Sequence, residues 1–218
     1  MTPTIIYCHG FASSPGSTKA NIFAQRFQAR GISCRIPDLN VPDFEHLTLT
    51  AMLQRIAEEV RDCPPGALYL MGSSLGGAVA LHFTDRYRNA EAATVGKLLL
   101  MAPALDFAAN RLRQLGEEGL AQWKETGWRE VYHYGYKEQC RLHYGSHEDS
   151  LTYDSFGVSF DIPILIFHGT RDAAVDHHQS VRFAENRPNV ELQLLDSDHE
   201  LLDQVDVIWE GALAFFGV

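Results

Sequence analysis

Short apolar runs alternate along the chain with segments whose apolar residues recur at helical spacing. A continuous apolar run of about five residues indicates a buried strand, and apolar residues three and four apart indicate one face of a helix. We predict strands at residues 4–8, 32–36, 67–71, 97–101, 164–167 and 190–195. We predict helices at residues 18–30, 49–61, 74–87, 175–184 and 201–216.

This alternation predicts the fold class. Continuous apolar strands that alternate with helices are typical of a parallel sheet covered on both faces. We therefore expect an α/β fold, with a mostly parallel sheet of about six or seven strands and helices on both faces. The length of 218 residues fits one domain with its own core, so we assign residues 1–218 to a single domain.

One interval breaks the alternation. About sixty residues separate the strands at 97–101 and 164–167, whereas a crossover between parallel strands needs only a dozen or more. The interval holds most of the chain's tyrosines. We predict an insertion at about residues 104–160 that folds over one end of the sheet as a cap or lid. A divergent helical layer packed on the sheet is the alternative.

The sequence GSSLGG at residues 72–77 joins a predicted strand to a predicted helix. It fits the pattern G-x-S-x-G with Ser74 at its centre, where a nucleophile sits on a sharp strand-to-helix turn and needs small neighbours. Ser73 does not fit, because its equivalent neighbours would be Met71 and Leu75. Two other interpretations stay open, a glycine-rich turn without chemistry and a phosphate-binding turn, although the Walker lysine is missing.

A serine nucleophile needs a base and an acid, which follow it in the order Ser, Asp or Glu, His in this kind of sheet. His199 follows the last predicted strand, and Asp172 follows the strand before it. These two are the preferred base and acid. The rival acids are Asp106, Asp176, Asp196 and Asp198, of which Asp176 has the position of a helix N-cap. The rival bases are His82, His177 and His178, of which His82 falls on the core-facing side of its helix.

An oxyanion hole needs two backbone N–H donors. Leu75, directly after Ser74, would supply one, and Phe11, in the loop after the first strand, the other. We expect Gly10 to permit the sharp turn of this loop and His9 to brace it by hydrogen bonding. The pair His168-Gly169 repeats the same two residue types after another strand, and we interpret it as turn geometry. Phe11 and Leu105 would also line an apolar pocket for the acyl chain.

The composition restricts the classes of molecule that this protein can bind as its main partner. The net charge is −10, with 45% apolar and 21% charged residues, which argues against nucleic acid or an anionic membrane as the main partner.

No apolar run approaches the ~20 residues of a membrane span, and the first residues do not resemble a signal peptide, so we expect a cytoplasmic location. The cysteines form no C-x-x-C pair, so we expect no structural disulfide; they are Cys8, Cys34, Cys63 and Cys140.

A metal site is weakly suggested by His143 and His147, which are four residues apart as two ligands on one helix face would be. Gly145 lies between them and no H-E-x-x-H occurs, so we predict solvated or pocket-lining histidines and no metal.

Taken in order, HGF, GSSLGG, HGTRDAAV and DH resemble the motifs of the α/β-hydrolase superfamily. HGFASSPG together with GSSLGG resembles more narrowly the small bacterial esterases of the YqiA/YcfP type. The resemblance covers essentially the whole chain and implies an α/β-hydrolase fold. It also implies a serine hydrolase that cleaves carboxylic ester or acyl thioester bonds of a small-molecule substrate without a cofactor.

The resemblance assigns Ser74 as nucleophile, Asp172 as acid and His199 as base, with Phe11 and Leu75 as oxyanion donors. Residues 104–160 are longer and more aromatic than in the shortest family members, so substrate preference does not transfer. An acyltransferase, thioesterase or peptidase on the same machinery stays open, as does a non-catalytic binding module. The oligomeric state is left open.

Overall fold

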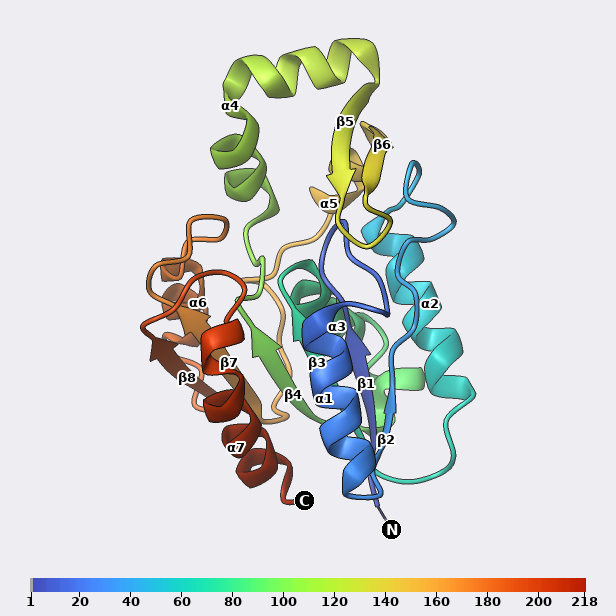
Figure 1. Cartoon of the computed structure of the whole chain (residues 1–218), viewed down its shortest axis with the longest axis vertical. Coiled ribbons are helices and arrows are strands. Elements are labelled where there is room, and N and C mark those ends of the chain that lie inside the picture. Colours follow the sequence, from blue (N-terminus) through green and yellow to red (C-terminus); the bar gives the residue numbers. More distant parts are fainter. Residues whose placement is uncertain (1) are drawn as a thin grey trace.

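The computed structural model describes residues 2–218 and centres on a six-stranded sheet (Figure 1). The strands lie in the order β2-β1-β3-β4-β7-β8, and each neighbouring pair is parallel. They are β1 (Thr4–Cys8), β2 (Ser33–Arg35), β3 (Leu68–Ser73), β4 (Val95–Met101), β7 (Ile164–Gly169) and β8 (Val190–Leu195). The parallel α/β prediction is confirmed.

Helices cover both faces of the sheet (Figure 1). They are α1 (Thr18–Ala29), α2 (Leu49–Arg61), α3 (Leu75–Arg86), α6 (His178–Ala184) and α7 (Val205–Phe216). Ile5 and Tyr7 of β1 belong to the core cluster that α1 and α7 share, whereas Ile6 and Cys8 belong to the cluster of α2, α3 and α6. Because alternate side chains of a strand point to opposite faces, both sets must be apolar, which explains the continuous apolar runs.

Aromatic packing fastens α1 and α7 to each other on one face. Phe27 of α1 meets the edge of Trp209 at a centroid distance of 4.8 Å, and Phe216 lies 6.3 Å from Phe27. Phe27 is fully buried. Full burial of such a side chain contributes about 1.5–3 kcal/mol.

Two helices begin several residues later in the chain than predicted. The predicted helix at 201–216 begins only at Val205, because Leu201 has a left-handed backbone (φ 54°) and residues 202–204 form a short 3₁₀ turn. The predicted helix at 175–184 is helical only from His178 onward. The helix at 49–61 is as predicted, and the Thr48 hydroxyl caps it by accepting the Ala51 N–H at 3.1 Å.

The chain between β4 and β7 forms α4 (Phe107–Thr126), the antiparallel pair β5 (Trp128–His133) and β6 (Glu138–His143), and α5 (Gly145–Ser150). α4 and the hairpin stand beyond the carboxyl ends of the strands (Figure 1). α4 bends at Gly116, whose φ of 66° is outside the helical region. That residues 104–160 act as a cap or lid stays a prediction.

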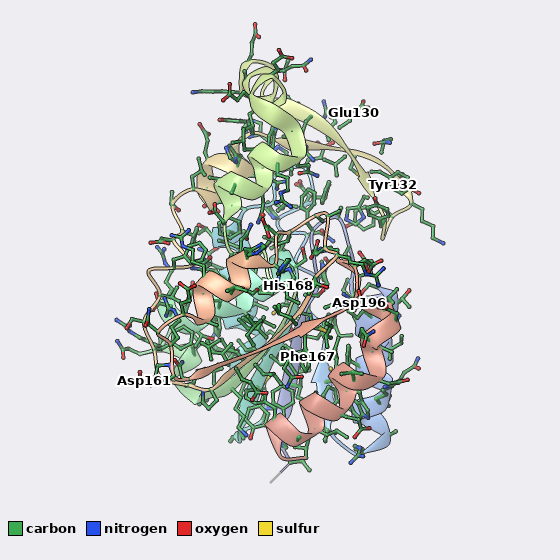
Figure 2. All side chains as sticks on the ribbon, turned by 90° about the vertical axis from the view of Figure 1, so that its left-hand side faces the viewer. Glu130, Tyr132, Asp161, Phe167, His168 and Asp196 are labelled. Atoms are coloured by element: carbon green, nitrogen blue, oxygen red, sulfur yellow. The ribbon has the colours of Figure 1, made fainter. Side chains whose placement is uncertain are left out.

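The tip of the hairpin is attached to the loop that follows β1. The backbone N–H of Tyr134 donates to the carbonyl of Ala12 at 2.9 Å, and His133 is fully buried beside it. Figure 2 shows His168 and Asp196 near the upper edge of the sheet, below the hairpin that carries Glu130 and Tyr132. The hairpin therefore lies next to the loop in which we expect an oxyanion donor.

No helix within residues 2–218 has the length and apolar character needed to cross a bilayer. The four cysteines are free thiols.

Candidate active site

Ser74 lies at the turn between β3 and α3, with φ 54° and ψ −120°. A positive φ at a non-glycine residue costs on the order of 1–3 kcal/mol and persists only where its surroundings hold it. Here the Ser74 N–H donates to the Met101 carbonyl at 2.9 Å, and the Ser74 carbonyl accepts the N–H of Ala104 at 3.1 Å. Both partners come from β4 and the segment after it, so the neighbouring strand holds the strained turn.

The glycines around Ser74 are required by close backbone contacts. A Cβ on Gly72 would collide with the carbonyl of Gly76, and a Cβ on Gly76 would collide with the carbonyl of Cys8 in β1. A Cβ on Gly77 would lie 2.9 Å from the Cβ of Pro103. The small neighbours that the motif predicts are therefore a consequence of packing α3 tightly against β1 and β4.

A chain of hydrogen bonds joins the three residues that the sequence singled out. His199 Nε2 lies 3.0 Å from Ser74 Oγ, and His199 Nδ1 lies 2.7 Å from Asp172 Oδ2. Ser74 and His199 are 125 residues apart in sequence. The His199 side chain is 23% exposed and that of Asp172 is fully buried, so the chain of bonds runs from the surface inward.

Asp172 is held as a carboxylate. Burial by itself raises its pKa, but hydrogen bonds from His168 and His199 outweigh burial, and the net pKa lies well below the usual range. Its other oxygen, Oδ1, accepts the N–H groups of Ala174 and Val175, each at 2.8 Å. An ionised carboxylate can only accept, so His199 Nδ1 must carry the proton and His199 Nε2 is free to act as a base toward Ser74.

His168 is one of the residues that the sequence interpretation missed. Its ring is fully buried, and Nε2 lies 3.1 Å from Asp172 Oδ2 and 3.2 Å from the Val175 carbonyl. Both neighbours of Nε2 are acceptors, so Nε2 carries a proton, and Nδ1 lies 2.7 Å from the Ser180 hydroxyl. The interpretation of His168-Gly169 as turn geometry is wrong, because both are the last residues of β7. The four-residue spacing from His168 to Asp172 was the available signal.

The hydroxyl of Ser73, the other serine of the motif, is hydrogen bonded to a different residue. Ser73 is the last residue of β3, and its hydroxyl accepts a hydrogen bond from the buried ammonium group of Lys19 at 3.1 Å. Burial lowers the pKa of Lys19, opposed by the charges of Glu200, Asp198 and Asp172. Lys19 was also not predicted as part of this region. Within residues 2–218, His199 Nε2 is hydrogen bonded to Ser74 Oγ and not to the Ser73 hydroxyl.

The loop after β1 lies against Ser74. A Cβ placed on Gly10 would be 3.5 Å from the Cβ of Ser74, and within residues 2–218 the N–H groups of Phe11 and Leu75 donate to no protein acceptor. We predicted the sharp turn of this loop at Gly10. The residue with the left-handed backbone is instead Ala12, with a φ of 52°. His9 braces the loop as expected, because its Nε2 accepts the Leu39 N–H at 3.0 Å.

The rival acids have other partners. Asp106 caps α4 by accepting the Ala109 N–H, and Asp176 accepts the His178 N–H and pairs with Arg113. Asp196 is exposed and pairs with Arg171. Asp198 accepts the backbone N–H groups of Glu200 and Leu201. Asp172 alone among the five carboxylates is hydrogen bonded to His199.

Among the described residues, none of the rival bases is hydrogen bonded to Ser74. His177 and His178 are beside Asp176 at the start of α6. His82 is buried in α3, as its position on the core-facing side predicted, and its Nε2 lies 2.9 Å from the Ser155 hydroxyl. Burial lowers the pKa of His82 to about 4.

Stability should fall on acidification because of His82. The unfolded chain binds a proton near pH 6.5 but the folded one only near pH 4, so stability is lost as pH falls through this window. At 1.36 kcal/mol per pH unit, we expect about 2–3 kcal/mol less stability at pH 4.5 than at pH 7.5 from this residue alone. Urea unfolding of the wild type and His82→Gln at both pH values measures it. An equal loss in the two proteins would contradict the assignment.

Phe11 and Leu105 were predicted to line an acyl pocket. Phe11 is half-buried, and its ring packs against Phe44 at 5.5 Å between centroids. Leu105 is 1% exposed and lines a hollow of about 260 Å³. The hollow is also lined by Asp106, Phe107, Ala108, Ser150, Leu151, Tyr153, Asp154, Ser155, Phe156 and Arg182. The two substrate assignments stay predictions.

His143 and His147 do not form a cluster of metal ligands. His143 Nδ1 accepts the Gly145 N–H at 3.1 Å, and His147 packs against Trp123. Within residues 2–218, the one group of three close metal-binding side chains is Asp176, His177 and His178, which are consecutive residues at the surface.

Known proteins resemble this chain over nearly its full length. The human protein named palmitoyl-protein thioesterase ABHD10, mitochondrial, is 24% identical over 229 residues, covering 94% of this chain and 70% of its own length. The structure of mouse alpha/beta hydrolase domain-containing protein 10 superposes with a TM-score of 0.81 at 20% identity and covers 100% of this chain and 90% of that one. Est1E from Butyrivibrio proteoclasticus gives a TM-score of 0.76 at 20% identity, with 100% and 89% covered.

These superpositions show that the fold is that of the α/β-hydrolases, as the sequence predicted. A family model described as "Uncharacterised protein family (UPF0227)" matches residues 4–217. Because the match spans almost every residue of the chain, this protein belongs to the UPF0227 family.

Proposed function

We propose that this protein is a serine hydrolase that cleaves carboxylic ester bonds through an acyl-enzyme on Ser74. The observation that carries the proposal is the pair of hydrogen-bond distances at His199, 3.0 Å to Ser74 Oγ and 2.7 Å to Asp172 Oδ2. A nucleophile, a base and an orienting carboxylate within hydrogen-bond reach are the requirements for nucleophilic acyl transfer.

The first half-reaction forms the acyl-enzyme. His199 Nε2 takes the proton of Ser74 as Oγ attacks the ester carbonyl carbon, and Asp172 stabilises the imidazolium that forms. The backbone N–H groups of Phe11 and Leu75 bind the oxyanion; the Leu75 N–H also lies at the positive end of the α3 dipole. When the tetrahedral intermediate collapses, His199 gives its proton to the departing alcohol oxygen.

The second half-reaction releases the acid. Water enters where the alcohol left, and His199 Nε2 accepts one of its protons as the oxygen attacks the acyl carbon. The bond from the acyl carbon to Ser74 Oγ then breaks, and the same proton returns to the serine. One ester and one water yield one acid and one alcohol, and His199 ends as it began.

Thioesters are the second candidate substrates. A thiol is a better leaving group than an alcohol, and the same residues would cleave its acyl bond. The observation that favours them is that the related ABHD10 proteins are named palmitoyl-protein thioesterases. Residues 104–160, which stand beyond the carboxyl edge of the sheet, would then act as the lid that shapes the acyl pocket.

We place the activity in the cytoplasm, where free thiols are kept reduced.

A fluorophosphonate probe tests the proposal, because it reacts only with an activated serine. We expect a single adduct, mapped by peptide mass spectrometry to the peptide that contains Ser74 and absent in Ser74→Ala. Failure of the probe to label the folded protein would favour the alternative of a non-catalytic binding module. Labelling of a different serine would refute the role of Ser74.

A further inference from the structure

Two arginines of the inserted segment lack the acidic partners that their neighbours have. Arg113 in α4 pairs with Asp176 at 2.8 Å, and Arg141 in β6 pairs with Glu45 at 3.3 Å. In the described part of the chain, no carboxylate oxygen lies within 4.0 Å of a guanidinium nitrogen of Arg111 or Arg129. The chain has 28 acidic residues, so the missing partner is not explained by composition.

Buried donors at this place have no acceptor. Within residues 2–218, three buried side-chain nitrogen or oxygen atoms lack a hydrogen-bond partner: Nε and Nη1 of Arg129, and Nδ1 of His147. Buried polar atoms are nearly always paired, so the two unpaired N–H donors of Arg129 point to an acceptor from outside the chain. Within residues 2–218, the Arg111 side chain makes one hydrogen bond, in which Nη1 donates to the neutral Gln114 Oε1 at 3.0 Å.

Trp123 brings these groups together. Its buried ring lies 5.0 Å from the Arg129 guanidinium carbon and 5.7 Å from that of Arg111, and 5.8 Å from the His147 ring. The ring faces attract the cations but cannot accept all their N–H groups. The three residues come from α4, β5 and α5, so the folded insertion as a whole forms the cluster.

The same cluster adjoins the proposed oxyanion loop. The guanidinium carbon of Arg111 lies 4.9 Å from the centre of the Phe11 ring, and the Phe11 N–H is one of the two proposed oxyanion donors. Desolvation, with a smaller contribution from the charge of Arg129, lowers the pKa of Arg111 to about 10, so Arg111 stays charged at neutral pH. Two cations therefore contact the same Trp123 ring, and within residues 2–218 neither has a carboxylate oxygen within 4.0 Å.

We infer that Arg111 and Arg129 form a subsite for a negatively charged group of the substrate, a carboxylate or a phosphate. The inference rests on the proposed ester hydrolysis at Ser74 and names its substrate class: esters whose acyl or alcohol part carries an anion. Planar guanidinium groups match the paired oxygens of carboxylate and phosphate, which is why arginine is common in such sites. An anion would fill the unpaired donors and separate the two positive charges.

Two pairs of matched esters test the subsite. The first pair is mono-p-nitrophenyl glutarate and p-nitrophenyl valerate, which share a five-carbon acyl chain and differ in a terminal carboxylate. The second pair is 1-butyrylglycerol 3-phosphate and monobutyrin, which differ in a phosphate on the alcohol. We expect the wild type to prefer the anionic member of at least one pair by about tenfold in kcat/KM, and the pair that shows it identifies the anion.

Variants at both arginines locate the effect. Arg111→Gln and Arg129→Gln should each lower kcat/KM for the preferred anionic ester by about tenfold, mainly through KM, and leave the neutral ester within twofold. Arg113→Gln and Arg141→Gln, which remove paired arginines from the same segment, should change neither ester. Equal losses on anionic and neutral esters would show a structural role and overturn the inference. No anionic preference in either pair would also overturn it.

Binding measured without turnover separates this inference from the proposed function. Calorimetric titration of the wild type with glutarate and with inorganic phosphate, at constant ionic strength, should show saturable binding of at least one, lost in both arginine variants. If Ser74 resists the probe and no ester is cleaved, the proposed function fails while this binding still supports the subsite. Absence of saturable binding in an active enzyme would refute the subsite alone.

Discussion

Ser74→Ala should lower kcat for hydrolysis of p-nitrophenyl butyrate by a factor on the order of 10⁴ to 10⁶. The substitution removes the atom that would form the acyl-enzyme but leaves His199, Asp172 and both backbone donors in place. Any remaining rate would come from water attacking an ester polarised by Phe11 and Leu75. Initial rates at saturating ester measure kcat, and a thermal melt verifies that the variant is folded.

Ser73→Ala is the matched control for this result, because it removes the neighbouring hydroxyl. We expect less than a tenfold change in kcat, since that hydroxyl is bonded to Lys19 and not to His199. Stability should fall by about 1–3 kcal/mol, because the Lys19 ammonium loses a buried acceptor. Equal rates for wild type and Ser74→Ala, or a larger loss in Ser73→Ala, would contradict the assignment of the nucleophile.

Asp172→Asn should lower kcat by about 10⁴-fold through the tautomer of His199. Oδ1 of the asparagine can still accept the N–H groups of Ala174 and Val175, which places its NH₂ group where Oδ2 stood. That NH₂ group donates toward His199 Nδ1, so the ring proton must move to Nε2. The nitrogen that faces Ser74 then carries a proton and can no longer act as a base.

His168 adds a second unfavourable contact to this substitution. In the wild type its Nε2–H donates to the same Oδ2, and the asparagine NH₂ group would face that donor as well. The control is Asp176→Asn, which changes the rival acid and should leave kcat within about twofold, because Asp176 bonds to His178 and Arg113. A severe loss of kcat in Asp176→Asn, with Asp172→Asn still active, would assign the role of the acid to Asp176 and not to Asp172.

The strands and the turn at Ser74 were readable from the sequence because their causes are local. A strand buried on both faces needs a continuous apolar run, and the turn needs glycines at 72 and 76, where side chains would collide with backbone. The inserted segment was not readable in this way. Its helix, hairpin and second helix carry mixed aromatic and polar side chains, which are buried only after they pack on each other and on the loop after β1.

Alone, the amino-acid order determined that this is a parallel α/β chain in which a serine follows the third predicted strand, an aspartate the fifth and a histidine the sixth. That much is accessible because parallel strands bring their carboxyl ends to one edge. The sequence preferred Asp172 among five carboxylates, but only the tertiary structure places it within hydrogen-bond distance of His199 and His168, since a side chain's direction and reach depend on how the loops pack. The same holds for Arg111 and Arg129, which share Trp123 only because α4, β5 and α5 fold against each other.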